Sequence, residues 1–95
     1  MENDYLDKLI NDVGPSNFLK YFDLFARNYE LRPNKIFYEA FAKEDWKDNS
    51  KCSIASKGKK IFRESREIEV LKYLSISSFE NIAVQASEIL KRYKQ

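Results

Sequence analysis

Apolar residues recur every three or four positions along most of this chain, which is the spacing of one face of an α-helix. The range 4–13 is the first helix that this spacing predicts, and Gly14 is placed to end it. The apolar face of this helix consists of Tyr5, Leu6, Leu9, Ile10 and Val13.

The range 15–29 is predicted as a second helix, because the fixed φ of Pro15 suits a first helical turn. Its apolar face is aromatic and consists of Phe18, Tyr21, Phe22, Phe25 and Tyr29. Such a face could recognise a ligand, but an aromatic stripe at helical spacing is more often part of a core. We therefore expect Phe18, Phe22 and Phe25 to be buried.

A third helix is predicted over 33–43, and it again opens on a proline, Pro33. Its buried stripe should consist of Ile36, Phe37, Ala40 and Phe41. Trp46 follows this helix. Residues 47–50, with the sequence Lys-Asp-Asn-Ser, are predicted as a loop, because these short polar side chains compete with helical hydrogen bonds.

The range 53–63 shows the clearest division between an apolar and a polar face. The apolar arc consists of Ile54, Ala55, Gly58, Ile61 and Phe62, and the polar arc of Ser53, Ser56, Lys57, Lys59, Lys60 and Arg63. Gly58 lies in the middle of the apolar arc, where it costs about 1 kcal/mol of helix propensity relative to Ala. The close approach of an aromatic ring or of another helix would offset that cost.

The C-terminal part of the chain contains one ambiguous and one well-defined segment. Residues 67–76 fit both a strand and a helix, and we favour a helix because a lone strand would lack a partner. Ser77 and Glu80 form a capping-box pattern ahead of a last helix. Its apolar face should consist of Phe79, Ile82, Ala83, Ala86, Ile89, Leu90 and Tyr93.

Together these segments predict an all-α fold, a compact bundle of five or six short helices that forms one domain over residues 1–95. No stretch approaches the roughly 20 apolar residues of a membrane span. Cys52 is the only cysteine, and the acidic N-terminal segment does not resemble a secretory signal, so we expect a cytoplasmic protein that does not associate with membranes.

The residue types disfavour an enzyme. The chain has no histidine and only two glycines, which excludes histidine-based nucleophile pairs and glycine-rich phosphate loops. We expect no cofactor and no bound metal. A hard cation or a carboxylate-based hydrolase would have to use Glu44, Asp45 and Asp48, which lack calcium-loop spacing. Cys52 is more readily interpreted as a small buried hydrophobe than as a reactive thiol.

Basic residues are concentrated in the second half of the chain. Residues 1–50 contain seven Lys and Arg against ten Asp and Glu, while residues 51–95 contain ten against five. The candidate nucleic-acid-binding set consists of Lys51, Ser53, Ser56, Lys57, Lys59, Lys60, Arg63 and Arg66. The helices before and after residues 47–50 have roughly the spacing of a helix-turn-helix pair, although the loop is longer than the tight form and lacks its glycine.

The first hypothesis for function is therefore a small non-enzymatic DNA-binding or DNA-associated regulator. Three alternatives remain open. The basic arc could bind an acidic protein, or it could be only the solvated face of a surface helix. A third alternative is a protein-interaction module or inhibitor that uses apolar and aromatic surface left over from the core. Seven Phe and six Tyr are many for one small core and favour a homodimer.

Overall fold

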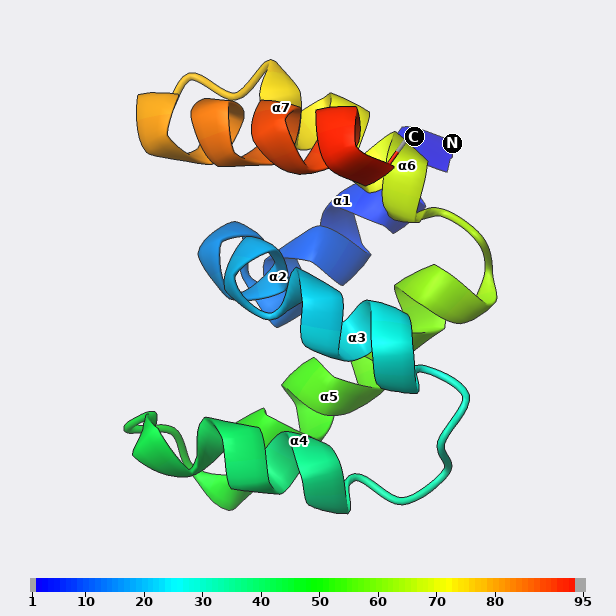
Figure 1. Ribbon diagram of the computed structural model, residues 1–95, viewed down its shortest axis with the longest axis vertical. Helices are drawn as coiled ribbons and strands as arrows, with labels where there is room; N and C mark the ends of the chain where they lie inside the picture. The colour runs from blue at the N-terminus through cyan, green and yellow to red at the C-terminus, as the bar shows by residue number, and fades with distance from the viewer. Residues whose placement is uncertain (1, 94–95) are drawn as a thin grey trace.

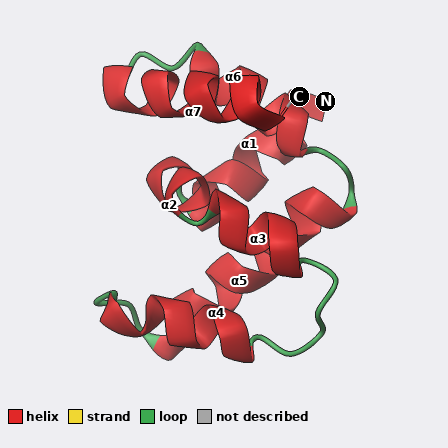
Figure 2. Cartoon of the chain, in the orientation of Figure 1, coloured by secondary structure: helices red, strands yellow, loops and turns green. Residues whose placement is uncertain are grey.

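The computed structural model describes the backbone of residues 2–93 and the side chains of residues 5–93. This part of the chain consists of helices joined by loops and contains no strand (Figure 2). The α-helices are α1 (Glu2–Val13), α2 (Pro15–Lys20), α3 (Phe22–Asn28), α4 (Lys35–Ala40), α5 (Asp48–Arg63), α6 (Glu67–Ser75) and α7 (Glu80–Tyr93), and the 3-10 turn η1 (Phe41–Lys43) follows α4. The all-α class is confirmed, but residues 2–93 contain seven α-helices and not five or six.

The helices are arranged in three tiers (Figure 1). An antiparallel pair, α6 and α7, lies at the top of the view; α1, α2 and α3 lie below it; and α4 lies at the bottom with the start of α5. The helix α5 packs against α1, α3 and α4 and so connects the lower two tiers. None of the helices in residues 2–93 combines the length and the apolar content needed to cross a bilayer.

The predicted second helix is broken at Tyr21, where φ is −108° and ψ is 20°. The break lets the two halves pack in different directions, because α2 contacts α1 and α7 while α3 contacts α5. Tyr21 itself packs edge-on against Phe41 and Trp46. A straight helix over 15–29 could not make both sets of contacts.

The core is built around the aromatic stripe. Phe18, Phe22 and Phe25 are buried as predicted, and Phe37 and Phe41 join them from α4 and η1. The rings of Phe25 and Phe37 stack with centroids 5.3 Å apart. The prediction that Ile36 belongs to the buried stripe of this helix is wrong. Ile36 is exposed because only one narrow face of the short helix α4 meets the core.

The helix α5 presents its apolar arc to this cluster. Ile54, Ala55, Gly58, Ile61 and Phe62 are all buried, which confirms that arc. A Cβ atom on Gly58 would lie 2.3 Å from Cε1 of Phe25, so the predicted close approach of an aromatic ring is also confirmed. Gly58 is thus the position at which α5 touches the edge of the Phe25 ring.

The prediction of a loop over 47–50 is wrong, because α5 begins at Asp48. The backbone N–H of Lys51 donates to the carbonyl of Lys47 at 3.0 Å and closes the first turn. Asp48 lies in that turn, where a carboxylate interacts favourably with the positive end of the helix dipole. The connection from η1 to α5 therefore shortens to four residues, 44–47.

The ambiguous segment is a helix, α6, as we favoured. The apolar face predicted for α7 is correct for Ala86 and Ile89, which are buried, but wrong for Phe79, which is 73% exposed. Phe79 precedes the helix, and its N–H donates to Oγ of Ser77 at 3.1 Å. Ser77 therefore bonds the Phe79 amide before the helix and not the Glu80 amide of a capping box.

Candidate nucleic-acid interface

The basic helix α5 projects its N-terminal half away from the core. Residues 48–50 and 52–53 are exposed, and Lys51 is half-buried. Ahead of them, the connection 44–47 is anchored to α2, because the carboxylate of Glu44 accepts hydrogen bonds from Tyr21 Oη and, at 2.7 Å, from Lys20 Nζ. The start of α5 is thus an exposed element on a fixed support.

The anchoring bonds change the acidity of both partners. Hydrogen bonds from Lys20 and Tyr21 lower the pKa of Glu44, so this carboxylate stays charged. Burial, together with the hydrogen bond to Glu44, raises the pKa of Tyr21 to about 12. Glu44 therefore links the connection 44–47 to Lys20 and Tyr21. In residues 5–93 no three Asp, Glu or Cys side chains are grouped so that they could hold a metal ion.

A ridge of small polar side chains runs along the solvent face of α5. Asn49, Ser53, Ser56 and Lys60 follow one another at spacings of three and four residues, and all four are exposed. We call these four residues the α5 ridge. Ser53, Ser56 and Lys60 belong to the sequence-predicted set. Asn49 was missed because residues 47–50 were predicted as a loop.

The placement of Lys59 on the polar arc is wrong. This side chain is only 3% exposed, and its Nζ donates to the carbonyl oxygens of Leu31 at 2.9 Å and Arg32 at 3.2 Å. Burial, and then the nearby charge of Arg63, lower the pKa of Lys59. Lys59 fixes the loop between α3 and α4, and it does not present a charge to solvent.

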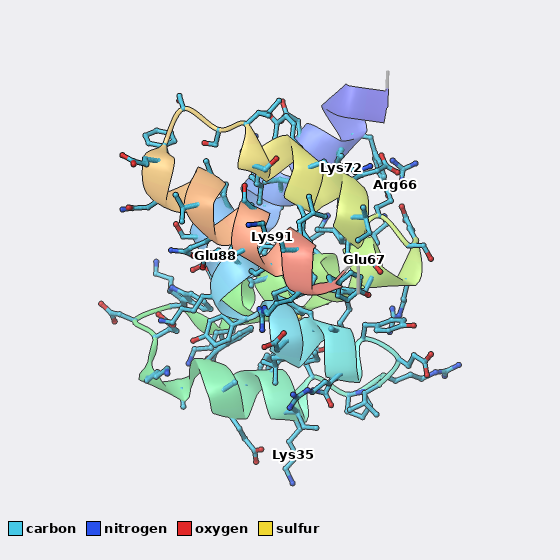
Figure 3. The ribbon with its side chains drawn as sticks, turned by 45° about the horizontal axis from the view of Figure 1, so that its top comes forward. Lys35, Arg66, Glu67, Lys72, Glu88 and Lys91 are labelled. Atoms are coloured by element: carbon cyan, nitrogen blue, oxygen red, sulfur yellow. The ribbon has the colours of Figure 1, made fainter. Side chains whose placement is uncertain are left out.

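Arg63 and Arg66 are also engaged within the molecule. Nε of Arg63 donates to the carbonyl of Tyr29 at 3.2 Å, but the residue remains exposed. Arg66 lies 3.5 Å from Glu64 and 3.7 Å from Glu69 in two ion pairs. Arg66 directly precedes α6, and Figure 3 shows it near the start of that helix. The carboxylates around Arg66 reduce what this guanidinium can offer an anion, so it lies at the margin of the site.

Lys57 and Lys60 lie where α5 packs on α1. Nζ of Lys57 is 3.6 Å from Oδ2 of Asp12, and Nζ of Lys60 is 5.5 Å from the centre of the Tyr5 ring. Both contacts are at the surface and contribute little to stability. The structure therefore brings Ser53, Ser56, Lys57, Lys60 and Arg63 onto one face of α5. Lys51 is half-buried and lies on the opposite side of the helix, three and four residues before the buried Ile54 and Ala55.

Cys52 lies beside this face and is exposed, so the interpretation of Cys52 as a buried hydrophobe is wrong. The reason is the earlier start of α5, which carries its first turns beyond the core and leaves the thiol uncovered. The buried part of α5 begins at Ile54 and Ala55.

A second distinctive surface lies at the turn between α6 and α7. Ile76 is 81% exposed and Phe79 is 73% exposed, and Tyr73 and Val84 flank them with large exposed fractions. A hollow of about 280 Å³ adjoins Phe79 and is lined by Tyr73, Leu74, Ile76, Ser77 and Ser78. Apolar side chains so widely exposed and so close together are typical of interaction surfaces.

The chain matches no protein-family model, and no curated protein and no solved structure is similar to it.

Proposed function

We propose that the protein is a non-enzymatic DNA-binding regulator whose α5 enters the major groove of a DNA duplex. In this proposal α4, the connection 44–47 and α5 act as a helix-turn-helix pair. The observation that carries it is the exposed start of α5, residues 48–53, which is joined to the preceding helix α4 through η1 and the connection 44–47. Helix-turn-helix proteins place the N-terminal residues of their second helix against base edges.

The side chains of the α5 ridge suit this role. Ser53 and Ser56 are short, so the helix backbone can approach the floor of the groove closely. Asn49 has the amide that pairs with both hydrogen-bonding positions of adenine in the major groove. Lys57, Lys60 and Arg63 lie on or beside the ridge and would contact backbone phosphates.

The first test is the salt dependence of binding to a DNA duplex, followed by fluorescence anisotropy. Three phosphate contacts, from Lys57, Lys60 and Arg63, predict that log Kobs falls against log salt with a slope of about −3. Binding should therefore weaken steeply between about 50 and 200 mM salt. The absence of duplex binding even at the lowest salt would refute the proposal.

The second test places negative charge on the ridge. The double variant Ser53→Glu, Ser56→Glu should bind at least roughly tenfold more weakly, because each carboxylate would face the phosphate backbone. Neither serine makes a side-chain hydrogen bond within residues 5–93, so the fold should persist. The double variant Gln85→Glu, Ser87→Glu on the exposed face of α7 adds the same charge, is the matched control and should bind like the parent. An acidic protein partner would be favoured instead if polyanionic protein but no duplex were bound.

Self-association through the α6–α7 turn is a second candidate function. It is favoured by the position of Phe79, a protruding ring beside a hollow of about 280 Å³. In a two-fold dimer each Phe79 would enter the hollow of the other copy, because a two-fold interface uses the same patch on both subunits.

Light scattering tests this second candidate directly. The parent should have twice the mass of an 11.3 kDa chain at high concentration, and Phe79→Ser should reduce it to the monomer mass. Val84→Ser, farther along α7, is a milder change to the same surface and should raise the dissociation constant less. A monomeric parent at high concentration would exclude a homodimer.

A further inference from the structure

A cavity of about 210 Å³ lies where α1 packs on α5, beside the α5 ridge. We call it the α1–α5 notch. It is lined by Tyr5, Lys8, Leu9, Asp12, Lys57 and Lys60. Lys57 and Lys60 come from the helix that we propose contacts DNA, while the other four residues come from α1. None of the α1 residues belongs to the basic set that the sequence identifies.

The notch carries a surplus of positive charge. It contains three lysines and one carboxylate, Asp12. The Asp12 carboxylate lies 3.6 Å from Lys57 Nζ, which is too long for a hydrogen bond, and both side chains are more than a third exposed. Such a pair is weak and is readily exchanged for a stronger anion. Among residues 5–93, Lys8 has no carboxylate within ion-pair distance.

The walls of the notch are preorganised. Leu9 is buried and forms an apolar wall, and Tyr5 is oriented by Glu64, whose carboxylate accepts from Tyr5 Oη at 2.9 and 3.1 Å. The Tyr5 ring in turn carries Lys60 Nζ at 5.5 Å and the Arg66 guanidinium at 5.4 Å from its centre. Two cations, Lys60 and Arg66, therefore lie close to the Tyr5 ring at this side of the notch.

We infer that the α1–α5 notch binds a backbone phosphate of the DNA duplex, with Lys8 as a phosphate contact supplied by α1. This inference rests on the proposed function, because it extends the surface of α5 onto a second helix. The three lysines and Asp12 give the notch a net charge of +2, which attracts the single negative charge of a phosphodiester. A contact from a second element would fix the angle at which α5 lies on the duplex, since phosphate contacts set orientation.

The test compares Lys8→Gln with Lys91→Gln in duplex binding across a salt series. Lys91 lies on the exposed face of α7, next to Glu88 in Figure 3, and its removal changes the net charge by the same amount. Lys8→Gln should weaken binding roughly fivefold at about 100 mM salt and reduce the magnitude of the slope by about one. Lys91→Gln should leave both quantities close to those of the parent.

Asp12→Asn provides a change in the opposite direction. It removes the carboxylate that competes for Lys57, so duplex binding should tighten by roughly the same factor. If Lys8→Gln behaves like Lys91→Gln while the parent binds duplex, the inferred phosphate contact in the notch is overturned and the proposed function stands. If the parent binds no duplex, the proposed function fails and the notch fails with it as a duplex contact.

A final arm distinguishes DNA from a free phosphate ligand. Inorganic pyrophosphate is titrated into the labelled protein, and the amide resonances of Lys8 and Leu9 are followed by NMR. Weak, salt-sensitive shifts together with duplex binding support a site for a DNA phosphate. Tight pyrophosphate binding that depends on Lys8, in a protein that ignores duplex, would overturn the assignment in favour of a small phosphorylated ligand.

Discussion

At the scale of single residues, Gly58 and Lys59 show what a helical period can and cannot predict. The position of Gly58 in the apolar arc predicts a close contact, and the Phe25 ring supplies it. Lys59 lies next in the chain on the polar side of the same wheel, yet it is buried. Its partners are the carbonyls of Leu31 and Arg32, which approach from a loop. The spacing of apolar and polar residues along one helix does not indicate where a loop from another part of the chain packs against it.

Gly58 leads to a prediction about stability. Gly58→Ala should lower the free energy of unfolding by about 1–3 kcal/mol through overpacking, although Ala favours a helix by about 1 kcal/mol. The new Cβ would lie 2.3 Å from a ring that is fully buried and stacked, so the ring cannot move aside. Urea unfolding measures the difference, and Ser56→Ala on the solvent face of α5 is the control. A Gly58→Ala variant as stable as the parent would mean that the Phe25 ring can shift.

Ser65 is a second residue whose effect on stability can be measured, because its backbone conformation is unfavourable for a residue with a side chain. Its φ is 56°, in the left-handed region, and it ends α5 with the N–H of Arg66 bonded to the carbonyl of Ile61 at 2.9 Å. Glycine is the preferred residue at this position of a helix end. Ser65→Gly should therefore raise the free energy of unfolding by about 1 kcal/mol. Ser87→Gly, inside α7, should instead lower it by about 0.5–1 kcal/mol, and equal effects of the two changes would contradict this reading.

At the scale of elements, the boundaries of the helices were harder to predict than their faces. The aromatic stripe over 15–29 continues without interruption through Tyr21, so no local signal marks the break there. The break follows from contacts with Phe41 and Trp46, which lie some twenty residues away in the chain. Likewise, the residue types of Asp48, Asn49 and Ser50 favour a loop. In the structure they form the first turn of α5, directly after the anchored connection 44–47.

That anchor predicts how stability depends on pH. The pKa of Tyr21 is about 12 in the folded protein and about 10 in the unfolded chain. Since the folded pKa is the higher one, the contribution of the Tyr21–Glu44 bond is fully present below about pH 10 and is lost as the pH rises toward 12. Urea unfolding between pH 8 and 11.5 should show this fall, and Tyr21→Phe should flatten it. An equally steep fall in Tyr21→Phe would assign the effect to another group, such as Tyr93, whose pKa is also about 12.

At the scale of the whole molecule, folding brings acidic residues of the first half of the sequence next to basic residues of the second half. The acidic half of the sequence packs against the basic half, so Asp12 meets Lys57 and Asp23 lies 3.9 Å from Arg92. The molecule is therefore not divided into an acidic and a basic pole. The positive surface that remains is local, around the α5 ridge and the α1–α5 notch. The sequence could identify the helix that carries it but not the contribution of α1, which depends on how the two helices pack.

The central claim is that α5 is the surface that meets DNA, and an NMR titration tests it most directly. A short duplex is added to the isotope-labelled protein at low salt, and the amide shift of every residue is measured. If α5 meets DNA, the largest changes fall on residues 49–60 and on Lys8, and α7 is nearly unaffected. Changes confined to the α6–α7 turn around Phe79, or no changes at all, would contradict it.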